Sequence, residues 1–503
     1  MESMQSVWFA THPTMTAPSS AFPDGGRFDT VVAGAGITGL TVAVLLARAG
    51  QKVAVVEARR VGAVATGNTT AKVSLLQGST LSGIRAHHDD DVLRAYVDGN
   101  REAQAWLLRF LDEREVDYQR RTAFTFAVQS DGVRTLEDEL HASRAAGLDV
   151  TWTTQTGLPF EVAGALALAN QAQIHPLLVL DALAAELVAH GGLVIEGARV
   201  TDADTEAGVR ITTTAGELVA EHLILATGSP VLERGGYFAK LEPLRSYATA
   251  YRVPGAIPQG MYLGVDHPTR SLRTIPVDGE ELLMVGGNGH VVGRADSEAE
   301  AVADLRRWTG RYFPGARATH AWSAQDYRAM DRVPYVGEMP RGGGRIFVAT
   351  GYNKWGMTNG VAAALSLSAR LLGGSMPWAE ALASRTPRPA VVLGAVAPNA
   401  KVAATLAKDW VQAELHAVAD EPPSEGEGVV GRGARGLPEA VSTVDGVTCR
   451  VSGVCTHLGG VVRWNDAEKS WDCPLHGSRF APDGTVIEGP AVEDLPPVDH
   501  PTD

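Results

Sequence analysis

The clearest chemical pattern in this 503-residue chain is a pair of cysteine–histidine motifs near its C-terminal end. Cys455-x-His457 and Cys473-x-x-His476 are separated by 15 residues. Thiolate sulfur and imidazole nitrogen bind transition metals, and three cysteines are too few for a disulfide framework. We therefore predict a metal centre whose ligands are Cys455, His457, Cys473 and His476.

Two kinds of centre use such ligands. Structural zinc sites space their first ligand pair by about two to four residues, which does not suit the single residue between Cys455 and His457. A Rieske [2Fe–2S] centre needs two loops, each of which gives one thiolate to one iron and one imidazole to the other. The spacing favours the Rieske cluster over zinc. We expect Cys449, on an adjacent strand, to be a small buried apolar residue rather than a ligand.

The residues around these ligands, "CTHLG", "CPLHGSRF" and "DGTVIEGPA", resemble Rieske domains over nearly all of residues 437–495. Gly460 and Leu475 stand where the respiratory subclass carries a second cysteine pair, which forms a disulfide there. Phe480 stands where high-potential members carry a tyrosine that donates a hydrogen bond, and Ser478 remains as a hydroxyl donor. The resemblance implies a cluster without the disulfide, in the lower part of the Rieske range of about −150 to +300 mV.

A second pattern, near the other end of the chain, predicts a dinucleotide site. An apolar strand at 28–33 leads into Gly34-x-Gly36-x-x-Gly39, an apolar helix follows, and a second strand ends at Glu57. Gly34 permits a tight turn, Gly36 lets the backbone approach a pyrophosphate, and Gly39 lets helix and strand pack. The helix N-terminus offers free amides, and Glu57 is placed to accept hydrogen bonds from a ribose. The predicted contacts are Gly34, Ala35, Gly36, Ile37, Thr38, Gly39, Glu57 and Ala58.

The same glycine pattern recurs at 431–436, but there it lacks its context. Pro438 follows where a helix should run, and no second strand carries an acid at the right distance. We interpret this segment as a linker or a hairpin turn. The sequence therefore predicts no second nucleotide site for NAD(P)H.

Three further segments, at 61–79, 216–230 and 344–374, indicate which dinucleotide is bound. In this order and spacing they resemble the FAD-binding blocks of D-amino-acid oxidase/glycine oxidase-like flavoproteins, over about residues 28–375. No cysteine precedes Cys449, which excludes a thioether-linked flavin and leaves noncovalent FAD as the expectation. The further contacts that the resemblance implies are Thr66, Thr69, Thr70 and Ala71 (pyrophosphate and flavin), Val200 (adenine), Ala226, Thr227 and Gly228, and Gly351, Tyr352, Asn353, Lys354, Trp355, Gly356, Met357 and Thr358 (isoalloxazine).

Lys354 lies in a loop before a helix that is expected to open near Met357. Reduced flavin gains negative charge, which the lysine and the N-terminal amides of the helix would stabilise. The alternative is that Lys354 is a solvent-exposed loop cation and Trp355 a packing residue.

The region between the flavin blocks carries the candidates for substrate contact. In the resembled family the corresponding region forms a sheet that roofs the reactive face of the flavin, and amine oxidation there often needs no dedicated protein base. Each candidate also has a packing or loop-stabilising alternative. The candidates are Tyr247, Tyr251, His290, Gln325, Asp326 and Arg328, of which Tyr247, Tyr251, His290 and Arg328 join Lys354 as predicted catalytic residues.

Composition limits the partners and the location. The formal net charge is −14, with 58 acidic and 44 basic residues and no block rich in Lys or Arg, which argues against nucleic acid or an anionic membrane. The first basic residue is Arg27, and no long apolar run occurs, so we expect neither a secretory leader nor a membrane span. A cytoplasmic location is the expectation.

Together these features predict an α/β Rossmann-like FAD-binding domain with an inserted antiparallel-sheet substrate domain, followed by a small all-β Rieske domain. The 503 residues exceed what one core usually supports, and 45% apolar residues suffice for several domains. The expected segments are an N-terminal extension (1–27), the flavoprotein unit (28–400), a helix at about 401–418 with a linker (401–436), and the Rieske domain (437–503).

Three functions remain open at this stage. The first is a dehydrogenase that oxidises a small amine or amino-acid-like substrate and passes electrons through the cluster to a one-electron protein acceptor. The second runs the flow inward, from a ferredoxin through cluster and flavin to a substrate or a partner oxygenase. The third is a regulatory protein whose redox centres sense rather than turn over.

Overall fold

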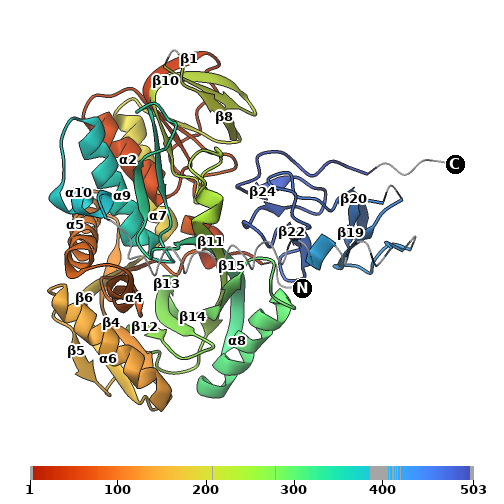
Figure 1. The fold of residues 1–503 in the computed structure, drawn as a ribbon. Coiled ribbons are helices and arrows are strands. Elements are labelled where there is room, and N and C mark those ends of the chain that lie inside the picture. Colours follow the sequence, from red (N-terminus) through yellow and green to blue (C-terminus); the bar gives the residue numbers. More distant parts are fainter. Residues whose placement is uncertain are drawn as a thin grey trace.

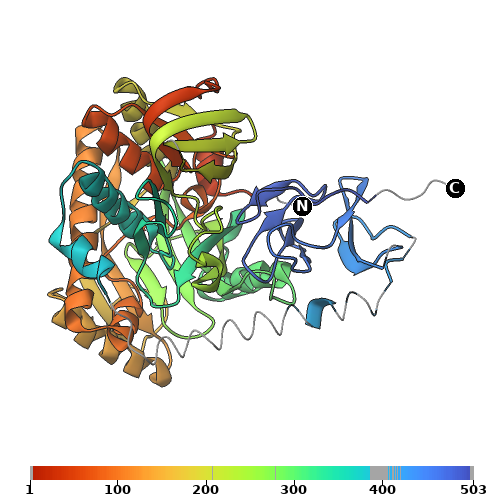
Figure 2. The same ribbon diagram turned by 45° about the horizontal axis from the view of Figure 1, so that its top comes forward.

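A computed structural model describes the chain as two large sheets in one body with a smaller β-domain beside it (Figure 1). Figure 2 shows the same small domain, in blue, against the side of the body from another direction. The predicted fold class is confirmed. The described residues are 4–206, 208–277, 279–385, 406, 408–410, 413, 415, 417–419, 421–434 and 436–498.

The first sheet has a parallel centre. Its central strand pairs in parallel with a strand on each side, so the carboxyl ends of these strands share one edge of the sheet. The predicted strand–helix–strand unit lies here, and its second strand ends one residue before Glu57. Within the described residues the order is β16 (Tyr335–Glu338), β17 (Ile346–Thr350), β10 (Gly216–Leu225), β1 (Gly26–Ala33), β2 (Val53–Val56) and β7 (Leu193–Ile195), with β8 (Val200–Asp204) and β9 (Val209–Thr213) attached to β10.

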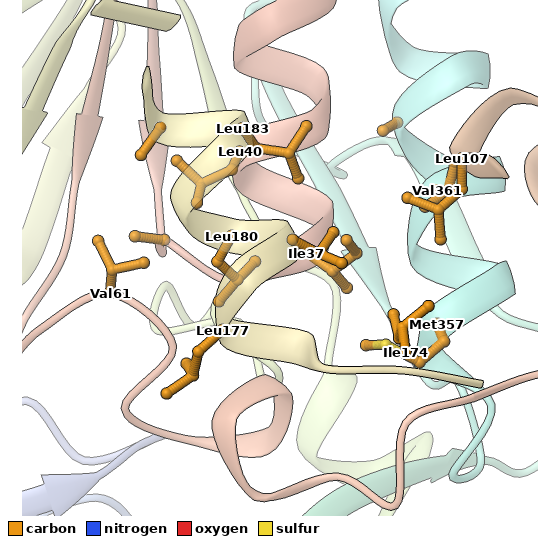
Figure 3. Packing of buried hydrophobic residues seen from close by; sticks show 14 of the residues in the cluster. Ile37, Leu40, Val61, Leu107, Ile174, Leu177, Leu180, Leu183, Met357 and Val361 are labelled. Atoms are coloured by element: carbon orange, nitrogen blue, oxygen red, sulfur yellow. The ribbon is translucent and has the colours of Figure 1, made fainter. Parts of the chain in front are cut away.

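Apolar residues alternate between the two faces of this sheet. Val32 faces the helices, whereas Val31 belongs to the core on the opposite face, together with residues of β8 and β9. On the helical face, Leu40 packs beside Leu180 and Leu183 (Figure 3). Burial of each such leucine stabilises the fold by roughly 1.5–3 kcal/mol, and this packing fixes the position of the helices that begin at the site. These helices are α2 (Ile37–Arg48), α5 (Asp90–Glu113), α7 (Pro176–Ala189) and α9 (Gly356–Leu371).

The second sheet is mainly antiparallel and is formed by strands from distant parts of the chain. Among the described residues its order is β15 (Arg317–Ala329), β11 (Leu241–Arg252), β14 (Glu280–Val291), β13 (Arg270–Val277), β12 (Met261–Gly264), β4 (Tyr118–Ala127), β6 (Gly164–Ile174) and β3 (Lys72–Val73), with β5 (Thr151–Thr153) beside β6. The other helices are α1 (Val7–Thr11), α3 (Ala65–Asn68), α4 (Thr80–His87), α6 (Ser130–Ala145), η1 (Tyr237–Ala239), α8 (Glu298–Tyr312) and α10 (Pro377–Ala383).

The small domain contains two short sheets around one apolar cluster. One of its strands, β18, lies inside the segment that we expected to be linker, so this sheet starts before residue 437. The glycine pattern at 431–436 spans the hairpin between β18 and β19, in agreement with the turn interpretation. The strands are β18 (Gly428–Arg432), β19 (Pro438–Val444) and β20 (Val447–Ser452), and β21 (Arg463–Asn465), β22 (Ser470–Asp472), β23 (Arg479–Phe480) and β24 (Val486–Glu488).

The N-terminal extension is packed into the larger body. Trp8 is fully buried and donates a hydrogen bond to the carbonyl oxygen of Thr69 at 2.8 Å. Ser6 donates to the carbonyl oxygen of Gly67 at 2.7 Å, so this segment supports the loop around α3. The helix expected at about 401–418 falls largely outside the described residues. In the part of the chain that is described, each helix is too short or too polar to span a bilayer.

Candidate functional site

The glycine turn after β1 has no room for side chains. A Cβ atom on Gly34, whose φ is +104°, would lie 2.5 Å from the carbonyl oxygen of Ala226. A Cβ atom on Gly39 would overlap the carbonyl oxygen of Gly34. Gly36 is the N-cap of α2 and offers no capping side chain; the first amide of the helix, that of Ile37, donates to Thr66 Oγ1 at 3.2 Å. The turn therefore has the form that a close-lying pyrophosphate requires.

Glu57 holds this turn in place. Its side chain is almost fully buried, and its two oxygens accept hydrogen bonds from the backbone amides of Ala35 and Arg59, both at 2.9 Å. Burial raises the pKa of Glu57, and the two hydrogen bonds act in the opposite direction. The carboxylate thus ties the end of β2 to the glycine turn.

A cavity opens at the carboxyl ends of β1, β2 and β10. The N-terminus of α2, the Glu57 carboxylate and the glycine turn meet there, so the lining fits the dinucleotide part of FAD. The predicted contacts that line it are Gly34, Gly36, Glu57, Ala58, Thr66, Val200, Ala226, Thr227 and Gly228.

Two arginines that the sequence interpretation missed also line the cavity. Burial lowers the pKa of both Arg59 and Arg199, and nearby carboxylates including Glu57 raise it. Cations in a partly desolvated cavity suit a pyrophosphate. The sequence could have indicated Arg59, because it lies two residues after the acid in "VEARR". It could not have indicated Arg199, because that residue comes from a turn far away in the sequence.

The loop between β17 and α9 joins the two sheets at the predicted isoalloxazine site. The hydroxyl of Tyr352 forms a 3.0 Å hydrogen bond with that of Thr38 at the start of α2. The backbone amide of Lys354 donates to the carboxylate of Asp326 in β15, and its Nζ donates to Ser246 Oγ in β11 at 2.6 Å. As predicted, the following helix opens at this loop.

Lys354 lies against three strands of the second sheet, β11, β14 and β15. Burial lowers its pKa, and attraction by Asp326 acts against this. A Cβ atom on Gly289 would lie 2.5 Å from its Nζ, so a glycine in β14 makes room for the ammonium group. By accessible surface Lys354 is exposed, as in the alternative that it is a solvent-exposed loop cation.

The other predicted flavin contacts are not part of the lining of this cavity. The backbone around Thr70 is held by Arg273, which is buried and donates to the carbonyl oxygens of Thr70 and Ala71 at 2.9 Å each. Thr358 Oγ1 accepts a 3.2 Å hydrogen bond from Gln77. The contacts outside the lining are Ala35, Ile37, Thr38, Gly39, Thr69, Thr70, Ala71, Gly351, Tyr352, Asn353, Lys354, Trp355, Gly356, Met357 and Thr358.

The predicted substrate residues are separated by the structure. Tyr247 and His290 form a pair, with 3.0 Å between the hydroxyl and Nε2. Nδ1 of His290 lies 2.9 Å from the carbonyl oxygen of Val291 and must donate to it, and burial lowers the pKa of this ring. His290 is therefore neutral at pH 7, with Nε2 accepting the proton of Tyr247.

Two other candidates, Tyr251 and Arg328, are held by contacts within the protein. Tyr251 is 2% exposed and packs in an apolar cluster with Leu305 and Phe313, so we do not carry it further as a catalytic residue. Arg328 donates to Glu242, which neutralises its charge. These packing and pairing contacts are non-local, which is why the strand sequences did not reveal them.

The four predicted metal ligands come together as two pairs. The interaction of the Cys455 and Cys473 thiols is the largest effect that lowers the pKa of Cys455, to about 7. The rings of His457 and His476 lie 5.1 Å apart between centroids, and Nδ1 of each ring is buried without a hydrogen-bond partner. No three His, Cys, Asp or Glu side chains within the described ranges are placed to hold one metal ion. A thiol pair beside an imidazole pair fits a Rieske cluster, in which two cysteines bind one iron and two histidines the other.

The loops around these ligands also fit the predicted subclass. A Cβ atom on Gly460 would lie 2.8 Å from the side chain of Leu475, so the two positions that carry cysteines in respiratory members meet in space. The hydroxyl of Ser478 contributes to lowering the pKa of the Cys455 thiol. Phe480 is fully buried and brings no hydroxyl.

Both histidine rings face the larger body. Nε2 of His457 forms a hydrogen bond with Glu233, and the ring of Phe238 meets that of His476 edge-on at 5.4 Å. Next to His476, the carbonyl oxygen of Gly477 accepts a 2.7 Å hydrogen bond from Gln325, which lines the cofactor cavity. Gln325, a predicted substrate contact, therefore lines the cavity and also links the two domains.

A buried ionic network fixes the same interface. Arg245 in β11 is fully buried and pairs with Glu468 and Asp472 of the small domain, and Arg479 binds the same two acids. Burial opposes ionisation of Asp472, but Arg479 and Arg245 outweigh it and hold its pKa at about 2. Removing one member of such a network typically costs about 3–5 kcal/mol, so the docked arrangement is strongly specified.

Two family models match the chain. The FAD dependent oxidoreductase model covers residues 29–370, and the Rieske [2Fe-2S] domain model covers residues 422–499. Together they account for both cofactor sites.

Known proteins repeat this architecture in whole or in part. YhfW of Bacillus subtilis (strain 168), described as a Rieske 2Fe-2S iron-sulfur protein, is 31% identical over 99% of this chain and 98% of its own length. The crystal structure of glycine oxidase from Geobacillus kaustophilus matches with a TM-score of 0.60 and 19% identity, over 70% of this chain and 96% of the oxidase. L-proline dehydrogenase from P. horikoshii matches with a TM-score of 0.59 and 16% identity, over 71% and 96%. At these identities the two structures establish the shared fold alone.

Proposed function

Because the chain belongs to the FAD dependent oxidoreductase family and ends in a Rieske [2Fe-2S] domain, we propose that it is a dehydrogenase for a small amine or amino-acid-like substrate. Electrons pass from FAD through the cluster to a one-electron protein acceptor such as a ferredoxin. FAD takes up an electron pair as hydride, whereas the cluster passes single electrons. The observation that carries the proposal is the contact of both cluster histidines with the flavin-binding body.

We assign Cys455, His457, Cys473 and His476 as the cluster ligands. The histidines bind iron through Nδ1, because that atom is buried and unpartnered in each ring, whereas Nε2 of His457 is bonded to Glu233. In the flavin site, Glu57 accepts from the ribose, the amides at the start of α2 hold the pyrophosphate, and Lys354 with the N-terminus of α9 stabilises negative charge on the reduced ring system.

The proposed substrate class rests on the fold neighbours and on the Tyr247–His290 pair. Glycine oxidase and L-proline dehydrogenase, as named, act on amino acids, and they share the fold of the larger body. In this chain Tyr247 is buried, and its hydroxyl donates to the neutral, half-buried ring of His290. A neutral imidazole does not protonate a substrate amine, which suits hydride transfer from a neutral amine.

The docked position constrains the electron partner. Glu233 and Phe238 cover the imidazole edges, so a partner protein does not meet them while the Rieske domain is docked. Electrons then move between flavin and cluster across the interface that contains Gln325 and Gly477. The partner approaches the cluster from another side of the small domain.

An anaerobic experiment tests the proposal. Oxidised protein is mixed with pools of amines and amino acids, and the absorbance of flavin and cluster is followed. The proposal expects a substrate that first decreases the flavin absorbance and then the cluster absorbance. If no pool reduces the flavin while a reduced ferredoxin reduces the cluster and then the flavin, the inward reductase function replaces the proposed one.

A further inference from the structure

The cavity at the glycine turn is closed by the Rieske domain. Three consecutive residues of that domain, Ile487, Glu488 and Gly489, form part of the cavity wall. They lie at the end of β24 and line the same cavity as Glu57 and Arg59 of the flavin-binding body. The FAD motifs in the chain end well before this segment, so no motif accounts for its presence there.

The segment is held on the cavity by residues that themselves line it. The guanidinium of Arg199 donates a 2.8 Å hydrogen bond to the carbonyl oxygen of Val486. The hydroxyl of Tyr327 donates to the carbonyl oxygen of Gly489 at 3.1 Å. Because Arg199 and Tyr327 both line the cavity, the closing segment is anchored directly at its rim.

Charge complementarity extends across the same boundary. Glu488 is 7% exposed, and among the charges around Arg59 it is the one that most strongly opposes the lowering of the Arg59 pKa by burial. Glu57 attracts the same guanidinium. Glu488 also forms a 3.9 Å ion pair with Arg479 of its own domain. Arg59 thus lines the cavity as a cation that is attracted by one carboxylate of each domain.

We propose that Ile487, Glu488 and Gly489 complete the FAD site, so that the docked Rieske domain retains the dinucleotide. Ile487 and Gly489 form the cover, and Glu488 is a positioning residue that acts through Arg59. FAD then leaves only when β24 separates from Arg199 and Tyr327. This inference rests on FAD as the occupant of the cavity and is independent of the direction of electron flow.

The rate of FAD release tests the inference. Holoprotein is diluted, and the rise in flavin fluorescence that accompanies release is followed. Ile487→Ala, Glu488→Gln and Tyr327→Phe should each release FAD about two- to tenfold faster, as expected for the loss of one contact. Tyr262→Phe is the matched control, because Tyr262 is equally buried and donates to the carbonyl oxygen of Thr156 at 2.8 Å but does not line the cavity.

Cluster absorbance and unfolding temperature are recorded for each variant, so that loss of the small domain is recognised. Release at the wild-type rate from both Ile487→Ala and Glu488→Gln, with the cluster intact, would overturn the inference. Equal acceleration by Tyr262→Phe would also overturn it, because general loss of stability would then explain the effect. No turnover is measured, so failure of the proposed electron route leaves this result interpretable.

Discussion

Replacing Glu57 separates its two roles, as an anchor of the glycine turn and as a cofactor contact. Glu57→Ala leaves the backbone amides of Ala35 and Arg59 without their acceptor. A hydrogen bond to a charged group contributes about 1.5–3 kcal/mol, so loss of one such bond to the ribose should raise the Kd for FAD roughly tenfold to a hundredfold. The Kd is measured by titrating apoprotein with FAD and following the quenching of flavin fluorescence.

Glu139 provides a matched control. It is fully buried and accepts hydrogen bonds from two backbone amides, those of Leu81 at 3.1 Å and Ser82 at 2.7 Å, but does not line the cavity. Glu139→Ala should therefore lower the unfolding temperature as Glu57→Ala does, without changing the Kd for FAD. If both variants lose stability and neither changes the Kd, Glu57 has only a structural role and the reasoning is refuted.

Three further predictions concern docking, ligation and pH. Gly293→Ala places a Cβ atom 3.0 Å from Pro474 of the small domain, whereas the control Gly279→Ala, at a similarly positive φ, meets nothing within 4 Å. In denaturant unfolding, Gly293→Ala should lower the free energy of unfolding by about 1–3 kcal/mol more than Gly279→Ala, and equal losses would argue against tight docking. His476→Ala should abolish the Rieske electron paramagnetic resonance signal while FAD still binds; an unchanged signal would exclude it as a ligand. Burial raises the pKa of Glu139 from 4.5 to about 7, so its folded form gains a proton before its unfolded form does as pH falls. Between pH 7 and 4.5 the wild type should gain up to about 3 kcal/mol relative to Glu139→Gln, and a flat difference in unfolding free energy would refute this.

The sequence predicted those parts of the site that depend on local spacing. Gly34, Gly36 and Glu57 belong to one strand–helix–strand unit, and Cys455 and His457 share one loop, so their geometry follows from a few neighbouring residues. The fold class followed from the order of such units.

The interface between the domains could not be predicted in this way. Arg245 has the pattern of an ordinary strand residue, and its partners Glu468 and Asp472 are more than two hundred positions away. Gln325 likewise was predicted to contact substrate from its position in the sequence, and only the fold shows that it lies against Gly477. Burial of such polar groups depends on contacts that are specified jointly by two domains.

The central claim, that flavin and cluster exchange electrons across this docked interface, is tested most directly with a Cys455→Ser/Cys473→Ser variant. The measurement is the anaerobic, substrate-dependent rate of reduction of a one-electron acceptor, with flavin absorbance recorded in parallel. The account predicts that the variant still shows substrate-dependent loss of flavin absorbance but reduces the acceptor far more slowly than the wild type. Reduction of the acceptor at the wild-type rate would contradict the claim and leave the Rieske domain without a relay role.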